Sequence, residues 1–224
     1  MHTIAIVNQK GGSGKSTLAE CLAVAATLDG KAAAILDLDP QGTVYAWSKR
    51  REDENPPVLS VTAANYKDEW QALKDAGADL IIIDTPARLQ ESVMNAASLA
   101  DLVIVPAKPT IKDLERVEDS IRLACLRTVI PTFVVLNQVR PQLGRSVEAE
   151  KAIAAQRYPV CPVRIGHRVA FEDADVSGQT PQETEPQGKA AHEIQQLYKY
   201  VCKILHQLTN EKVNKSTISE VNYG

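Results

Sequence analysis

The chain has 224 residues, of which 44% are hydrophobic and only 4% are aromatic. This length is typical of one α/β domain, and its core must be built mainly from aliphatic side chains. A net charge of −3 gives no global basic signature, so any nucleic-acid binding must come from a local patch. No apolar run approaches the roughly 20 residues that a membrane span needs, and the N-terminus has no charged-then-apolar leader. We therefore expect no membrane association.

The first predicted strand, residues 4–7, runs into a glycine-rich loop that opens a helix at about Ser16. This order of strand, loop and helix is the context that a phosphate-binding loop requires. Glycines let backbone N–H groups point at an anion, and the positive end of the helix dipole adds to the attraction. We expect Lys15 to contact the β- and γ-phosphates, Ser16 to bind Mg²⁺ and Thr17 to reach a phosphate. The loop consists of Gln9, Lys10, Gly11, Gly12, Ser13, Gly14, Lys15, Ser16 and Thr17.

Apolar runs and helical patterns then alternate along the chain. Strands are predicted at 32–39, 59–62, 80–84, 102–105 and 133–137, with a weaker last strand at 163–165; helices are predicted at 43–52, 66–76, 114–125 and 188–208. Continuous apolar strands separated by helices are typical of an α/β fold in three layers, with a mostly parallel sheet covered by helices on both faces. We divide the chain into a single domain at 1–208 and a polar C-terminal tail at 209–224.

Polar residues end several of the predicted strands, and ligands bind at the carboxyl ends of the strands in such sheets. Asp84 ends the most apolar strand and looks like a Walker B aspartate, which holds Mg²⁺. The residue after it is Thr85 rather than a glutamate, so the attacking water must be oriented from elsewhere. Asp37 and Asp39 alternate along one strand and therefore lie on the same side. For Asp37 two roles stay open, one near the metal and one as a carboxylate that caps a neighbouring loop.

Two motifs resemble the ParA/MinD family of ATPases. Residues 10–16 read K-G-G-S-G-K-S, which is similar to the family's deviant Walker A loop, and residues 37–41 read D-L-D-P-Q, which is similar to its Walker A′ segment. Residues 164–174 and 178–181 resemble the late segment of small plasmid ParA proteins. The resemblance implies that Lys10 crosses a dimer interface to the partner's phosphates, that Asp39 orients water and that Asn137 binds the adenine edge.

The same resemblance implies a function. A family member binds ATP and Mg²⁺, dimerises on ATP, binds DNA non-specifically, and hydrolyses ATP when a ParB-like centromere-binding or cargo adaptor stimulates it. We expect a cytoplasmic, nucleoid-associated P-loop ATPase for plasmid or chromosome partition, without the N-terminal DNA-reading domain of large ParA proteins. A close alternative positions a protein cargo such as a carboxysome or chemoreceptor cluster. The candidate DNA-contacting residues are Arg140, Arg145, Arg164, Arg168, Lys199 and Lys203.

Three further functions use related scaffolds. A dethiobiotin-synthetase-like ligase would not need Lys10 to reach a partner. An iron–sulfur carrier needs a ligating cysteine pair at its dimer axis, and the positions of Cys125, in a helical pattern, and Cys161, before a proline, disfavour it. A membrane-bound division regulator would use an amphipathic C-terminal helix. The stripe of that helix favours packing on the sheet instead; it consists of Leu197, Val201, Ile204, Leu205 and Leu208.

Overall fold

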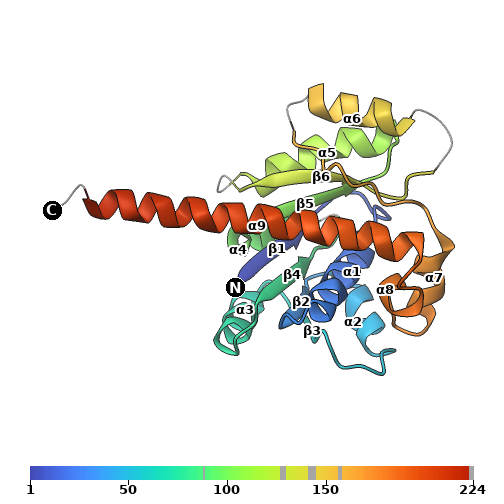
Figure 1. The fold of residues 1–224 in the computed structure, drawn as a ribbon, viewed down its shortest axis with the longest axis horizontal. Coiled ribbons are helices and arrows are strands. Elements are labelled where there is room, and N and C mark those ends of the chain that lie inside the picture. Colours follow the sequence, from blue (N-terminus) through green and yellow to red (C-terminus); the bar gives the residue numbers. More distant parts are fainter. Residues whose placement is uncertain (88, 127–129, 141–144, 156–157, 222–224) are drawn as a thin grey trace.

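A computed structural model gives the structure of residues 1–87, 89–126, 130–140, 145–155 and 158–221. Within these residues, parallel strands form one sheet in the order β3-β2-β4-β1-β5-β6 (Figure 1). The strands are β1 (His2–Ile6), β2 (Ala33–Asp37), β3 (Val58–Ser60), β4 (Leu80–Asp84), β5 (Leu102–Ala107) and β6 (Thr132–Leu136). The sheet confirms the predicted α/β fold, and it is parallel at every pairing described.

Helices cover both faces of this sheet (Figure 1). They are α1 (Lys15–Leu28), α2 (Thr43–Ser48), α3 (Tyr66–Asp75), α4 (Gln90–Leu99), α5 (Ile111–Ala124), α6 (Arg145–Ala155), α7 (Val169–Val176), α8 (Pro181–Thr184) and α9 (Lys189–Val221). Helices α1, α2 and α9 pack on one face, and helices α3 to α6 pack on the other. The three-layer architecture is thus the one that the apolar strands predict.

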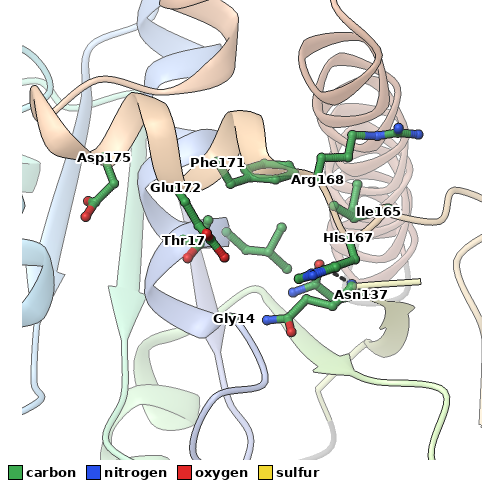
Figure 2. A pocket seen from close by; sticks show the side chains of 12 residues that line it. Gly14, Thr17, Asn137, Ile165, His167, Arg168, Phe171, Glu172 and Asp175 are labelled. Atoms are coloured by element: carbon green, nitrogen blue, oxygen red, sulfur yellow. Dashed lines mark hydrogen bonds between the residues drawn. The ribbon is translucent and has the colours of Figure 1, made fainter. Parts of the chain in front are cut away.

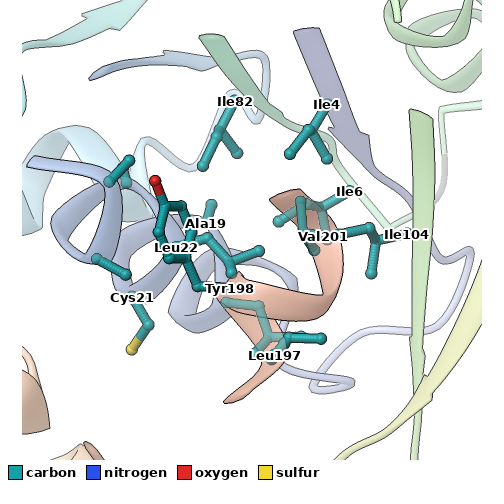
Figure 3. Close-up of a cluster of buried hydrophobic side chains, with 14 of the residues drawn as sticks. Ile4, Ile6, Ala19, Cys21, Leu22, Ile82, Ile104, Leu197, Tyr198 and Val201 are labelled. Atoms are coloured by element: carbon teal, nitrogen blue, oxygen red, sulfur yellow. The ribbon is translucent and has the colours of Figure 1, made fainter. Parts of the chain in front are cut away.

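Alternation along each strand sends side chains into two separate cores. Ile4 and Ile6 of β1 pack with α1 and α9 (Figure 3). Ala5 and Val7 pack on the opposite face with α4 and α5. Successive residues of a strand point to opposite faces, so a strand covered on both sides must be apolar throughout. The cores contain few aromatic side chains, as the composition predicts.

The register of the central strands brings several of the predicted site residues together. Ile6 pairs with Asp84 across β1 and β4, and Asp37 pairs with Asp84 across β2 and β4. The loop after β1 and the carboxylates that end β2 and β4 therefore meet at one edge of the sheet. This is the edge at which ligands bind in parallel α/β sheets.

The stripe of α9 packs on the sheet as predicted. Leu197, Val201 and Leu205 are buried in the core, and Ile204 and Leu208 pack against it. The predicted helix end at residue 208 is wrong, because α9 continues to Val221 and extends away from the body of the protein (Figure 1). Among the described residues, no helix has the length and apolar character needed to span a membrane.

The predicted last strand at 163–165 is also wrong. The segment is extended beside β6, and its bridges are isolated ones, between Val160 and Val134 and between Gly166 and Val139. The N–H group of Ile165 donates to the Leu136 carbonyl at 2.9 Å. Pro162 has no N–H group to donate, so a regular ladder cannot continue through this segment.

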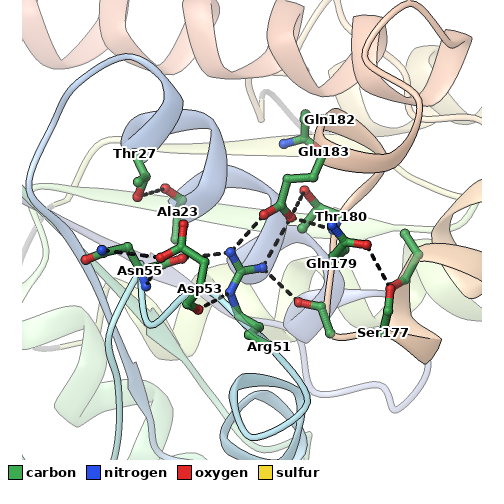
Figure 4. Close-up of polar contacts among 12 residues, drawn as sticks. Ala23, Thr27, Arg51, Asp53, Asn55, Ser177, Gln179, Thr180, Gln182 and Glu183 are labelled. Carbon is green, nitrogen blue, oxygen red and sulfur yellow. Dashed lines mark hydrogen bonds and ion pairs between the residues drawn. The ribbon is translucent and has the colours of Figure 1, made fainter.

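Arg51 ties the end of α2 to the segment around α8 (Figure 4). Its guanidinium donates to the Gly178 carbonyl at 2.8 Å and to Glu183 at 2.8 Å, and it lies 4.6 Å from the centroid of the Trp47 ring. Gly178 has a φ of 67°, and a Cβ there would lie 2.6 Å from the backbone nitrogen of Arg51. Arg51 therefore has a structural role, and its side chain is only 3% exposed.

Candidate functional site

The glycine-rich loop spans the gap between β1 and α1, as the sequence predicts. Lys15 is the first residue of α1 and is 7% exposed. Burial lowers the pKa of the Lys15 ammonium, and the nearby carboxylates of Asp84 and Asp39 oppose this shift. The cation is thus held next to carboxylates at the N-terminal end of a helix, where an anion is also stabilised.

Side chains from the end of β6 brace this loop. The Asn137 amide donates to the Ser13 carbonyl at 2.8 Å, and the Gln138 amide donates to the Gly12 carbonyl at 3.3 Å. Gly14 has a φ of 88°, and a Cβ there would lie 2.2 Å from the Asn137 amide nitrogen. A larger residue at this position would therefore displace the brace. Contact of Asn137 with an adenine edge stays a prediction, because its amide nitrogen is bonded to the loop in this structure.

Ser16 and Asp84 form a pair that fits a divalent cation. The Ser16 hydroxyl donates to Asp84 Oδ2 at 2.7 Å, while Asp84 Oδ1 is buried without a hydrogen-bond partner among the described residues. Burial raises the pKa of the Asp84 carboxyl to about 7, and the Ser16 hydrogen bond opposes the shift. Hard oxygen ligands with uncompensated negative charge suit Mg²⁺, which binds such sites together with phosphate oxygens. The pair therefore fits Mg²⁺, and the assignment of the metal to Ser16 and Asp84 stays a prediction.

Replacing Asp84 by asparagine is expected to stabilise the nucleotide-free protein at pH 8. Because the pKa of Asp84 is raised to about 7, the folded state holds an unfavourable buried carboxylate above that pH. The unfolded chain solvates the same charge, so the cost builds up between the unfolded and folded pKa values. This cost to the free energy of folding is up to about 4 kcal/mol at pH 8 and is smaller at pH 5.

Thermal unfolding of the wild type and Asp84→Asn at both pH values measures this effect. The gain in melting temperature should be larger at pH 8, and added Mg²⁺ with ADP should stabilise only the wild type strongly. An equal gain at pH 5 and pH 8 would show that the Asp84 charge is not the cause.

The two aspartates around the end of β2 differ in their contacts. Asp37 is fully buried and accepts from the N–H groups of Asp39 and Tyr45, both at 3.0 Å. Burial raises the pKa of Asp37, and these hydrogen bonds oppose the shift. Asp39 is half-buried and accepts from the Gln41 N–H at 2.9 Å. These contacts favour the loop-capping role for Asp37 and leave Asp39 closer to solvent.

Thr85 occupies the position where many P-loop ATPases carry a general-base glutamate. Its hydroxyl is fully buried and donates to the Ile6 carbonyl at 2.8 Å. Thr85 therefore connects β4 to β1 and cannot reach an attacking water. This supports the expectation that the water is oriented by Asp39.

Lys10 makes a contact that the sequence does not predict. Its ammonium lies 2.5 Å from Asp113 Oδ2 on α5, and the Thr110 hydroxyl donates to the same oxygen. The Lys10 side chain is 34% exposed, whereas the Asp113 side chain is 1% exposed. The second Asp113 oxygen has no hydrogen-bond partner among the described residues. Removal of Lys10 would thus leave a buried carboxylate with little compensation.

A cavity of about 230 Å³ lies beside the loop (Figure 2). Gly14 and Thr17 of the loop and Asn137 of the brace line one side of it, and Phe171 and Glu172 point into it from α7. A cavity that joins a phosphate loop to an aromatic ring and polar groups suits a nucleoside. The sequence singles out the segment around Phe171 by resemblance only, and it gives no local signal for the cavity.

Comparison with known proteins also assigns a nucleotide-binding site to this chain. The family model described as the CobQ/CobB/MinD/ParA nucleotide-binding domain matches residues 4–181. The chain is 28% identical over 216 residues to maintenance of carboxysome distribution protein A of Gloeobacter kilaueensis, covering 91% of this chain and 94% of that protein. It is 27% identical over 237 residues to the chromosome-partitioning ATPase Soj of Thermus thermophilus, covering 88% and 94% of the two chains.

A solved structure shares the fold. The septum site-determining protein MinD of Pyrococcus horikoshii, in complex with Mg-ADP, superposes with a TM-score of 0.68 at 20% identity, over 92% of this chain and 98% of that one. The matched segment includes the whole phosphate loop and the Ser16–Asp84 pair. The chain therefore belongs to the CobQ/CobB/MinD/ParA nucleotide-binding family and is an ATPase that uses ATP and Mg²⁺.

Proposed function

We propose that this ATPase segregates or positions cargo along DNA. In this cycle, ATP binding closes a homodimer, the dimer binds DNA non-specifically, and a ParB-like or cargo adaptor stimulates hydrolysis, which resets the monomer. The proposal depends on one observation above all: the phosphate loop contains a second lysine, Lys10, whose side chain is 34% exposed. A metabolic ligase on this scaffold would not need that cation to reach a partner protomer.

The contacts of Lys10 suit a residue that changes partner. Its ammonium is paired with Asp113, which is buried and rigidly placed by Thr110 at the start of α5. Breaking this pair costs free energy because it leaves the Asp113 charge buried. The partner protomer's triphosphate, with its concentrated negative charge, can offset that cost. Lys10 is then released from Asp113 only when a nucleotide and a second protomer are both present.

The residues of the loop have distinct roles in hydrolysis. The N–H groups of 11–16 and the Lys15 ammonium hold the phosphates, and Thr17 adds a hydroxyl. Mg²⁺ bound by Ser16 and Asp84 would neutralise charge on the phosphate oxygens. Asp39 orients the attacking water, and Asp37 fixes the backbone of Asp39 through its N–H group. Asp37 therefore affects hydrolysis by positioning Asp39, and it does not contact the nucleotide or the attacking water.

The names of the relatives support two kinds of cargo. One is a carboxysome-distribution protein, and the other is a chromosome-partitioning ATPase. Both kinds require the same ATPase cycle, and only the adaptor differs. We infer a cytoplasmic, nucleoid-associated protein in either case, with plasmid or chromosome partition as the first function and positioning of a protein cargo as the second.

The candidate DNA-contacting residues divide into two groups. Arg164 forms a two-point ion pair with Glu150, and Arg168 forms one with Glu193, so neither cation is uncompensated. Lys199 and Lys203 are exposed on α9 and have no ion-pair partner among the described residues. Arg140 is exposed, and the side chain of Arg145 lies outside the described part of the structure. Lys199, Lys203 and Arg140 are therefore better candidates for phosphate contacts than the paired arginines, and the two lysines lie one turn apart on α9.

Retention of the ATP-bound protein on DNA is expected to fall steeply as salt rises. Each lysine that contacts a phosphate contributes about 0.9 to the slope of log affinity against log salt. The double variant Lys199→Ala/Lys203→Ala should therefore reduce that slope by about 2 per protomer. Arg164→Ala is the matched control, because its charge is already compensated by Glu150.

DNA binding measured between 50 and 200 mM salt, on the order of the physiological range, tests this prediction. A flat salt response of the wild type with ATP would reject DNA binding by this protein. A slope reduced by Arg164→Ala and unchanged by the lysine variant would move the DNA-binding surface to another face.

A further inference from the structure

A third lysine, Lys108, stands beside the phosphate loop. It directly follows β5, which pairs with β1 so that Ile6 lies opposite Ile104. The loop after β1 consequently crosses the end of β5, and the Asn8 amide donates to the Pro106 carbonyl at 2.6 Å. A Cβ placed on Gly12 would lie 3.9 Å from the Lys108 ammonium nitrogen.

The Lys108 ammonium beside Gly12 has no counter-charge among the described residues. Lys108 is half-buried, and among the described residues its ammonium has neither a hydrogen bond nor an ion pair. Its backbone is fixed, because β5 ends at Ala107 and the Thr110 N–H donates to the Lys108 carbonyl at 2.8 Å. By contrast, Lys10 is neutralised by Asp113. An anion bound beside Gly12 would therefore gain an ion pair with this ammonium without breaking an existing one.

The charges around the loop indicate which anion this is. Asp37, Asp39 and Asp84 bring three carboxylates to the carboxyl edge of the sheet, and Lys15 is the loop cation that faces them. A nucleotide adds further negative charge at the same place. With Lys10 held by Asp113, the positive charges placed against this site within one protomer are Lys15 and the Mg²⁺ that Ser16 and Asp84 would hold. Lys108 supplies an additional positive charge from the adjacent strand.

We propose that Lys108 is a phosphate-binding lysine that contacts the β-phosphate of the nucleotide in its own protomer. Gly12 belongs to the backbone cradle that surrounds the phosphates next to the loop lysine, so an ammonium beside Gly12 is within reach of that group. The contact acts in binding, and it strengthens nucleotide affinity before any dimer forms. It depends on the ATPase site alone and not on DNA or cargo.

Calorimetric titration of the monomer with Mg²⁺ and ADP tests this role. Lys108→Ala should weaken ADP binding by roughly tenfold, which is typical of one lost charge-assisted hydrogen bond. AMP lacks the β-phosphate, so its affinity should change by less than about twofold. Lys108→Arg keeps the charge and should stay close to the wild type, and the difference between wild type and Lys108→Ala should shrink as salt rises.

Lys112→Ala is the matched control, because Lys112 is exposed on α5 in the neighbouring turn. It should bind ADP like the wild type. Wild-type ADP affinity in Lys108→Ala would overturn the proposal, and so would an equal loss of ADP and AMP affinity. A Lys108→Ala protein that binds ADP normally but fails to dimerise with ATP would also overturn it, since that result assigns Lys108 to the partner's nucleotide.

Discussion

Lys10→Ala is expected to abolish ATP-dependent dimerisation while monomer binding of ADP stays within about threefold of the wild type. A contact between an ammonium and a phosphate is a charge-assisted hydrogen bond, worth about 1.5–3 kcal/mol. Two such contacts form in a symmetric dimer, so their loss weakens dimerisation by about one hundredfold to ten-thousandfold. Size-exclusion chromatography with a slowly hydrolysed ATP analogue measures the dimer, and calorimetry with ADP measures the monomer.

The buried carboxylate of Asp113 makes a second variant necessary. Lys10→Ala removes the cation that compensates this carboxylate, so the variant also loses folding stability. The double variant Lys10→Ala/Asp113→Asn removes both charges and should regain the stability without regaining the dimer. Asp113→Asn alone frees Lys10 and should dimerise at least as readily as the wild type. Normal dimerisation of Lys10→Ala would reject the proposed exchange of partners.

Asp39→Ala is expected to trap an ATP-bound dimer on DNA. Loss of a residue that orients or activates the attacking water typically costs about 10²–10⁴ in rate. Asp39 is half-buried after β2, while Thr85, at the usual position of the base, is fully buried and bonded to Ile6. Nucleotide binding should remain, because Asp39 is not among the cradle residues. Slow hydrolysis then holds the protein in its DNA-bound form.

Single-turnover hydrolysis of ATP tests the loss of rate. DNA retention with ATP tests whether the dimer is trapped on DNA. Asp39→Asn preserves the shape of the side chain and its acceptor for the Gln41 N–H group, so it is the matched variant. If the carboxylate charge matters, both substitutions slow hydrolysis and prolong DNA binding. Unchanged turnover in Asp39→Ala would move the water-orienting role to another residue.

The fold and the phosphate loop could be predicted because their signals are local. A buried parallel strand is a continuous apolar run, and the loop from Lys10 to Thr17 is one uninterrupted motif. Ser16 and Asp84 could be paired because both belong to motifs that act together in P-loop ATPases. The structure places them in direct contact, and the orphaned Asp84 oxygen agrees with the metal role.

The contacts of Lys10 and Lys108 could not be predicted, since they join segments that are distant in sequence. Lys10 and Asp113 are separated by 103 positions, and nothing near Asp113 signals a charge partner. The run from Thr110 to Asp113 is recognisable only as the start of a helix, because its threonine caps α5. Lys108 reaches Gly12 through the pairing of β1 with β5, which strand patterns do not specify.

The predicted end of the last helix at residue 208 is wrong for a different reason. The polar residues after it offer no apolar stripe, and a stripe is the main sequence signal for a helix. The structure nevertheless continues α9 to Val221 as one helix. Without an apolar stripe, the sequence leaves only backbone propensity to indicate where a helix ends, and single sequences report propensity weakly.

The brace on the phosphate loop has a thermodynamic consequence. Asn137 and Gln138 already hold the carbonyls of Ser13 and Gly12, so the loop loses most of its conformational entropy when the protein folds. The phosphate loop is then already ordered when the nucleotide binds, so little binding free energy is lost in ordering its backbone. More of the nucleotide binding free energy therefore remains to stabilise the dimer that forms afterwards.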